Sequence, residues 1–89
     1  MIKTKRSYEI KMCNILNQIL NGDIKPNTGL NFSDDIEFTN VLLDLIDQKM
    51  VSGIILHQSY TSNDFFDFTQ TLSVTYKGLI FLEQFKSSQ

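Results

Sequence analysis

The chain has 89 residues, a formal net charge of −2 and one cysteine, Cys13. This length suits a single domain over residues 1–89, with a core just large enough to fold alone. The sequence shows no apolar run of membrane-spanning length, no signal-peptide pattern and no pair of cysteines for an internal disulfide. We therefore expect a cytoplasmic protein without membrane contact.

The first predicted element is a helix from about Lys5 to Asn21. Its inner stripe has helical spacing and consists of Tyr8, Met12, Ile15, Leu16, Ile19 and Leu20. Asn21 and Gly22 accept the left-handed conformation that ends many helices. Cys13 lies within this apolar pattern, which favours a small buried side chain over a reactive thiol. Residues 23–32 are expected to form a connector that includes a short helical turn.

A second helix is predicted over residues 33–50, with Ser33 as its N-cap and Asp34 and Asp35 in the first turn, where they favour the helix dipole. The apolar stripe comprises Ile36, Phe38, Val41, Leu42, Leu45 and Ile46. The opposite, outward face comprises Glu37, Asn40, Asp44, Asp47 and Gln48. This outward face is acidic, although it belongs to the helix that would read DNA in a helix-turn-helix protein.

A β-hairpin is predicted after this helix. The expected segments are a helix break at 51–53, a strand at 54–58, a turn at 59–64 and a second strand at 65–74. Alternation places Phe66 and Phe68 on one face of the second strand. Phe65 and Asp67 lie on the other face, where an exposed Phe65 needs a partner.

The last predicted element is a helix from Thr75 to Phe85, capped by Thr75 and favoured by Lys86 at its end. Its apolar residues occupy more than one face; they are Leu79, Ile80, Phe81, Leu82 and Phe85. Either the helix is wedged into the core on both sides, or it contacts another subunit. The excess of apolar surface favours the second interpretation and predicts a homodimer through this helix.

The order of these elements predicts an α+β fold, a winged helix-turn-helix with a C-terminal helix after the β-hairpin wing. The segments YEIKMCNILNQILNG (8–22), DLIDQKMVSGI (44–54) and VTYKGLIFL (74–82) resemble the YjcQ family of small winged-helix proteins from Gram-positive bacteria and their phages. The chain departs from that family at Met50, where relatives commonly have Gly, and at Val74, where they have Leu. The resemblance implies the fold, suggests DNA binding and assigns no catalytic residue.

The charges are unevenly distributed along the chain. Half of the basic residues lie near the N-terminus, at Lys3, Lys5, Arg6 and Lys11. Between residues 31 and 67 there are seven acids, Asp34, Asp35, Glu37, Asp44, Asp47, Asp64 and Asp67, and one base, Lys49. Because DNA affinity depends on neutralising phosphates, a DNA-binding surface would have to use the N-terminus.

Residues with catalytic or metal-binding potential do not form a recognisable motif. His57 is the sole histidine, which excludes a multi-histidine metal site within one chain, and we place it half-exposed on the wing strand. The acidic residues fit a solvated helix face better than a catalytic pair. The aromatic cluster of Tyr60, Phe65, Phe66 and Phe68 fits packing better than nucleic-acid stacking, since its neighbours are acidic. We predict neither enzymatic activity nor a cofactor.

Two functional hypotheses follow. In the first, the protein is a dimeric DNA-binding transcriptional regulator: Thr39, Asn40 and Lys49 contact the major groove of double-stranded DNA, and Lys3, Lys5, Arg6 and Lys11 contact phosphates. In the second, it is a protein-interaction module whose acidic residues Glu37, Asp44 and Asp47 bind a basic partner. Such a partner could be a DNA-binding protein or a nuclease whose inhibition benefits a phage.

Overall fold

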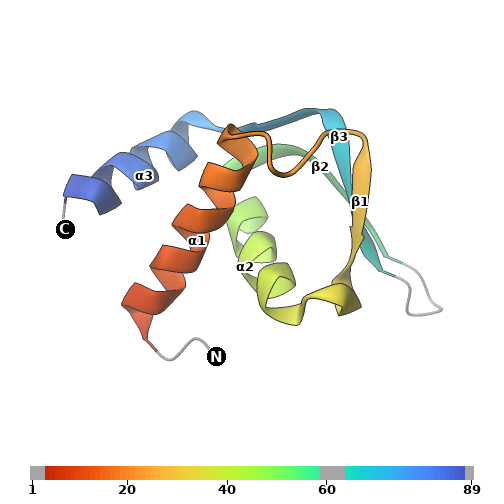
Figure 1. Cartoon of the computed structure of the whole chain (residues 1–89), viewed down its shortest axis with the longest axis horizontal. Helices are drawn as coiled ribbons and strands as arrows, with labels where there is room; N and C mark the ends of the chain where they lie inside the picture. Colours follow the sequence, from red (N-terminus) through yellow and green to blue (C-terminus); the bar gives the residue numbers. More distant parts are fainter. Residues whose placement is uncertain (1–3, 59–63, 88–89) are drawn as a thin grey trace.

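The computed structural model describes residues 4–58 and 64–87 and contains three α-helices and a three-stranded sheet in this part of the chain (Figure 1). The elements are helix α1 (Lys5–Leu20), strand β1 (Thr28–Asn31), the 3-10 turn η1 (Phe32–Asp34), helix α2 (Ile36–Asp47), strands β2 (Val51–His57) and β3 (Phe65–Val74), and helix α3 (Tyr76–Ser87). The predicted α+β class is confirmed, as are the β-hairpin and the helix that follows it. The arrangement is consistent with a winged-helix domain.

The sheet has three antiparallel strands in the order β1-β3-β2. Phe66 lies opposite Leu30 on β1 and Leu56 on β2. Phe66 and Phe68 are both buried, which confirms that they share the inner face of β3. On the other face, Phe65 has the partner that it needs: the ring of His57, which is partly exposed as predicted, stacks on it with centroids 4.5 Å apart.

The core lies between α1, α2 and the inner face of the sheet (Figure 1). Its fully buried side chains are Leu16, Val41, Leu42, Leu45 and Phe66. Cys13 is also buried, as predicted. The predicted stripes are wrong at two positions, because Leu20 is 51% exposed and Ile36 is 68% exposed. Each of these residues occupies the end of its helix, where the apolar stripe extends past the surface against which it packs.

Strand β1 lies in the segment predicted to be a connector, and the strand was not expected. Turn η1 begins at the last residue of that segment and continues over Ser33 and Asp34, which were predicted to begin the second helix. The sequence Thr28–Asn31 is TGLN, which has neither the length nor the β-branched alternation typical of a strand. It becomes a strand because β3 offers it an unpaired edge, with Gly29 opposite Asp67. The two helices are thus joined by a strand and a 3-10 turn.

Helix α2 is shorter than predicted at both ends. Its N-cap is Asp35, whose carboxylate accepts a hydrogen bond from the Phe38 amide at 3.0 Å, whereas Ser33 lies within η1. The helix ends at Asp47 because Lys49 adopts a left-handed φ of 62° and the Met50 amide bonds back to the Leu45 carbonyl at 2.9 Å. Strand β2 then begins at Val51.

Gly53 lies inside β2, although the sequence suggested that it belongs to a helix break. Its φ is +78°, and the pairing of β2 with β3 is irregular between Ser52 and Ile54. A Cβ at this position would lie 2.4 Å from the backbone of Leu72 and of Thr71. The glycine therefore permits a β-bulge, at which the backbone of β3 lies very close to Gly53 on β2.

Helix α3 begins as predicted. The Thr75 hydroxyl accepts a hydrogen bond from the Gly78 amide at 3.3 Å and donates one to the Lys49 carbonyl at 2.6 Å. Leu82 packs into the core. Thr75 therefore caps α3 and joins its first turn to the end of α2.

Candidate interaction surfaces

Helix α1 contacts α2 through two polar pairs that involve the predicted acidic face. The Tyr8 hydroxyl donates a hydrogen bond to the Asp44 carboxylate, and the Lys11 ammonium lies 3.0 Å from Glu37. Glu37 and Asp44 are thus both engaged by α1. Two of the three acids proposed to bind a partner therefore also help to join the helices.

The contact with Asp44 changes the acidity of Tyr8. Partial burial raises the pKa of the phenol from 10.0 to about 12, and the hydrogen bond to Asp44 and the negative charge of that carboxylate act in the same direction. The phenol is consequently protonated at neutral pH and acts as the donor of the pair.

The predicted phosphate-binding residues do not form one free basic cluster within the described part of the chain. Lys3 lies outside the described residues. Lys5 is exposed, whereas Lys11 is paired with Glu37. The Arg6 guanidinium is also exposed and lies over the Phe85 ring, 5.4 Å from its centroid, so this cation also contacts α3.

The predicted groove-reading residues are divided between the interior and the surface. Thr39 is 5% exposed, and its hydroxyl donates a hydrogen bond to the Phe32 carbonyl at 2.9 Å. It holds η1 against α2 and is not available to DNA, so this assignment is wrong. Asn40 and Lys49 are exposed.

The outward stripe of α2 is less acidic than the sequence indicated. It consists of Ile36, Asn40, Leu43 and Asp47, which recur with helical spacing; Leu43 is partly buried and packs against the core, and the other three are exposed. Ile36 at one end is the most exposed aliphatic side chain of the described residues. The sequence did not predict the exposure of Ile36, because an apolar residue at the first position of a helix fits the inner stripe as well as the outer one. Asp34 and Asp35, both exposed, precede it.

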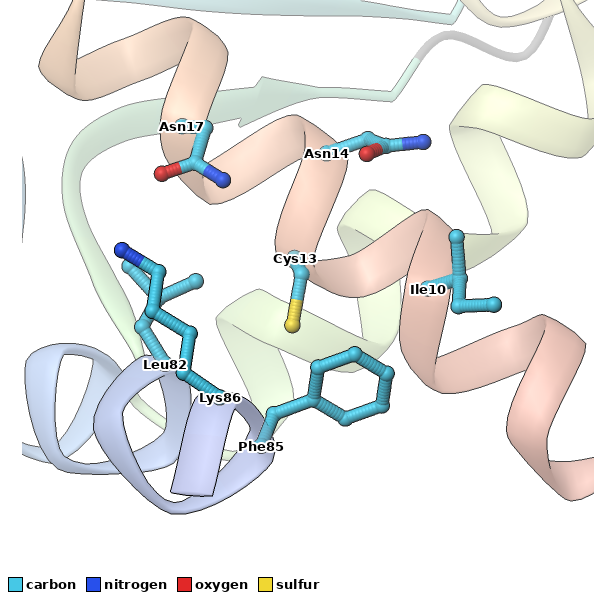
Figure 2. A pocket seen from close by; sticks show the side chains of 7 residues that line it. All are labelled: Ile10, Cys13, Asn14, Asn17, Leu82, Phe85 and Lys86. Atoms are coloured by element: carbon cyan, nitrogen blue, oxygen red, sulfur yellow. The ribbon is translucent and has the colours of Figure 1, made fainter. Parts of the chain in front are cut away.

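A groove lies between α1 and α3. One hollow of about 320 Å³ is lined by Ile10, Cys13, Asn14, Asn17, Leu82, Phe85 and Lys86, and a second of about 210 Å³ by Arg6, Glu9, Phe81, Gln84 and Phe85. Figure 2 shows the Cys13 sulfur directed from α1 toward the side of the pocket that Phe85 forms, with the Lys86 amine on the same side as Asn17. Phe85 lines both hollows. The sequence suggested unsatisfied apolar surface on the last helix but not this groove.

Cys13 is buried in the wall of this groove, among apolar and polar side chains. Burial raises the pKa of its thiol, Glu9 adds to this effect, and Lys86 opposes it. A raised pKa leaves less thiolate at neutral pH, so the geometry does not favour a nucleophilic cysteine.

Within residues 4–58 and 64–87, no group of three or more His, Cys, Asp or Glu side chains is placed to hold a metal ion. None of the described helices is long and apolar enough to cross a membrane. The surfaces on α2 and between α1 and α3 are therefore the candidate sites that we consider.

No protein-family model, curated protein or solved structure matches this chain.

Proposed function

We propose that this protein is a small protein-interaction module, and that the outward stripe of α2 binds a basic partner. The observation that carries the proposal is the combination of a protruding Ile36 with exposed carboxylates at both ends of α2. Asp34 and Asp35 lie at one end, and Asp47 lies at the other. An exposed apolar side chain within a polar rim is a common form of protein interface.

The charges around α2 favour a cationic partner over nucleic acid. The carboxylates near the start of α2 would lie close to phosphates if the helix entered a DNA groove, and each such contact opposes binding. Lys49 is the one exposed cation at the other end. The same carboxylates attract a partner rich in Lys and Arg and raise its association rate. Ile36 then offers apolar contact area once the partner is aligned.

DNA binding by a winged helix-turn-helix is a second candidate, favoured by the arrangement of the elements. The sheet order β1-β3-β2 and the direct passage from α2 into the hairpin are consistent with a winged-helix domain. In this proposal Asn40 and Lys49 approach the bases, and Lys5 and Arg6 approach phosphates. A relationship to the YjcQ family would support this second candidate, because the resemblance to that family implies the same winged-helix fold.

Two fluorescence-anisotropy titrations separate the candidates. The first probe is a labelled amphipathic helical peptide of leucine and lysine, and the second is a labelled duplex of mixed sequence. The protein-interaction proposal expects saturable binding of the peptide and weaker binding of the duplex at low salt. The DNA proposal expects duplex binding that weakens steeply with salt, in proportion to the number of phosphate contacts.

Variants identify the surface that is responsible. Ile36→Ser and Asp47→Lys should each weaken peptide binding several-fold, since they remove the apolar contact or reverse a charge. Asp23→Lys is the matched control: it makes the same charge change at an exposed residue in the turn after α1 and should have a smaller effect. Equal losses in Asp47→Lys and Asp23→Lys would indicate attraction by net charge alone and would contradict a site on α2. Duplex binding that is lost in a Lys5→Glu variant would instead support the second candidate.

A further inference from the structure

Helix α3 has two faces with different surroundings. The stripe that packs against the body of the domain consists of Gly78, Phe81, Leu82 and Phe85. The opposite stripe has the same spacing and consists of Tyr76, Leu79, Ile80 and Glu83. Tyr76 is 79% exposed and Leu79 is 41% exposed. The second stripe is thus an amphipathic ridge with three apolar side chains and a carboxylate, of which Ile80 is partly buried and the other three are exposed.

The groove between α1 and α3 offers this ridge apolar side chains and a similar length, beside polar side chains such as Asn14 and Asn17. Its apolar lining includes Ile10, which is 41% exposed, and the Phe85 ring. Figure 1 shows that α1 and α3 diverge, and the two hollows follow the space between their side chains. The lining residues of α1 run from Arg6 to Asn17, a rise of roughly 16 Å, and the 12 residues of α3 rise roughly 18 Å. A helix of the length of α3 therefore matches the groove.

The charges match in the same way. Lys86 lies at one hollow and Arg6 at the other, and both are exposed. Glu83 on the ridge is exposed and has the opposite charge. The second hollow also contains Glu9, beside Arg6, so the cationic end of the groove is the hollow that contains Lys86. The first hollow has no acidic side chain in its lining.

We infer that the groove between α1 and α3 receives the α3 ridge of a second copy of this chain. Because groove and ridge share α3, a two-fold axis lets each copy fill the groove of the other, so the interface is isologous and closes as a dimer. Leu79 and Ile80 of one copy then cover Ile10 and Phe85 of the other, and Glu83 approaches Lys86. This inference does not rest on the proposed role of α2.

Sedimentation equilibrium on the whole chain from 1 to 200 µM tests the dimer. The wild type should show a monomer–dimer equilibrium in this range. Ile10→Asp in the groove and Leu79→Asp on the ridge should each raise the dimer dissociation constant at least tenfold. Ile55→Asp is the matched control, because Ile55 is 50% exposed on β2, away from this face, and its replacement should leave the equilibrium unchanged.

Charge reversal tests the pairing directly. Glu83→Lys should weaken the dimer, and the double variant Glu83→Lys with Lys86→Glu should restore it. Circular dichroism and thermal melts of each variant establish that the monomer is folded. Mixing Ile10→Cys chains with Leu79→Cys chains, both in a Cys13→Ala background, should give disulfide-linked heterodimers on oxidation.

Three results would overturn the inference. A wild-type chain that remains monomeric at 200 µM has no such interface. A dimer that survives both Ile10→Asp and Leu79→Asp but dissociates with Ile55→Asp uses the sheet instead. A monomer that binds octanoate, with loss of binding in Lys86→Gln, would assign the groove to a small apolar carboxylate in place of a second copy.

Discussion

Replacing Gly78 by alanine should destabilise the protein through one defined contact. Gly78 is buried, and its Cα lies close to the backbone of the segment between α2 and β2. A Cβ at Gly78 would lie 2.4 Å from the Met50 carbonyl oxygen and 2.6 Å from Cγ1 of Val74. The Met50 carbonyl also accepts a hydrogen bond from the Thr75 amide at 3.0 Å. Relief therefore requires movement of α3 or of the backbone between α2 and β2.

The expected magnitude is the sum of three effects. Overpacking a well-packed interior costs about 1–3 kcal/mol. Distortion of the hydrogen bond to Met50 adds about 1 kcal/mol. Alanine favours a helix over glycine by about 1 kcal/mol, which opposes both costs. We expect Gly78→Ala to lower the free energy of unfolding by about 1–3 kcal/mol, equivalent to a fall in melting temperature of about 4–24 °C for a domain of this size.

Urea unfolding followed by circular dichroism measures the effect. Gly22→Ala is the comparison variant, because a Cβ there meets nothing within 4 Å and only the left-handed φ of +79° is strained, at about 1 kcal/mol. Gly53→Ala combines a clash with a left-handed φ and should be the most damaging of the three. If Gly78→Ala proves as stable as the wild type, the close approach to Met50 is not a constraint and the reasoning is refuted.

Three further substitutions or reagents probe individual side chains. The pKa of Tyr8 is about 12 in the folded chain and 10.0 ordinarily, so its stabilising contribution is complete below pH 10 and is lost as pH rises through 12. In unfolding measurements at several pH values, Tyr8→Phe should reduce this loss of stability by about 1 kcal/mol after allowance for solvent screening. An unchanged dependence of stability on pH would contradict the pairing of Tyr8 with Asp44. Thr39→Val leaves the Phe32 carbonyl without its donor and should cost about 1 kcal/mol in urea unfolding, whereas a neutral effect would contradict that role. Cys13 should react with a chromogenic disulfide at least about tenfold more slowly in the folded chain than in the unfolded chain, because the thiol is buried and its pKa is raised. Equal reaction rates would show that the fold does not protect the thiol.

Local signals predicted the elements that depend on neighbouring residues. The extent of α1, the alternation of Phe66 and Phe68 and the Thr75 cap were all correct, because periodicity and capping act over a few residues. The same local reasoning was wrong at Ser33, since Asp34 and Asp35 offer competing caps and the packing of η1 selects Asp35. It missed β1, whose pairing with β3 supplies what its own sequence lacks.

The candidate sites were only partly predictable for a related reason. The acids of α2 were visible in the sequence, but the residues that engage them are distant along the chain: Tyr8 is 36 positions from Asp44. Thr39 was assigned to the DNA groove as a polar residue of the second helix, yet its hydroxyl donates to a carbonyl of η1. The distribution of charge along the sequence therefore located the acidic region. It could not show which carboxylates contact other parts of the chain and which are exposed to a partner.

The sequence by itself determined the α+β class, the hairpin, the uneven distribution of charge and the presence of apolar residues on both faces of the last helix. Tertiary structure decided which surfaces those residues form. It paired Lys11 with Glu37, buried Thr39, exposed Ile36 and placed Phe85 in the lining of two hollows. Periodicity, capping and composition are properties of neighbouring residues, whereas these contacts join segments far apart in the chain and form only when the helices and the sheet pack together.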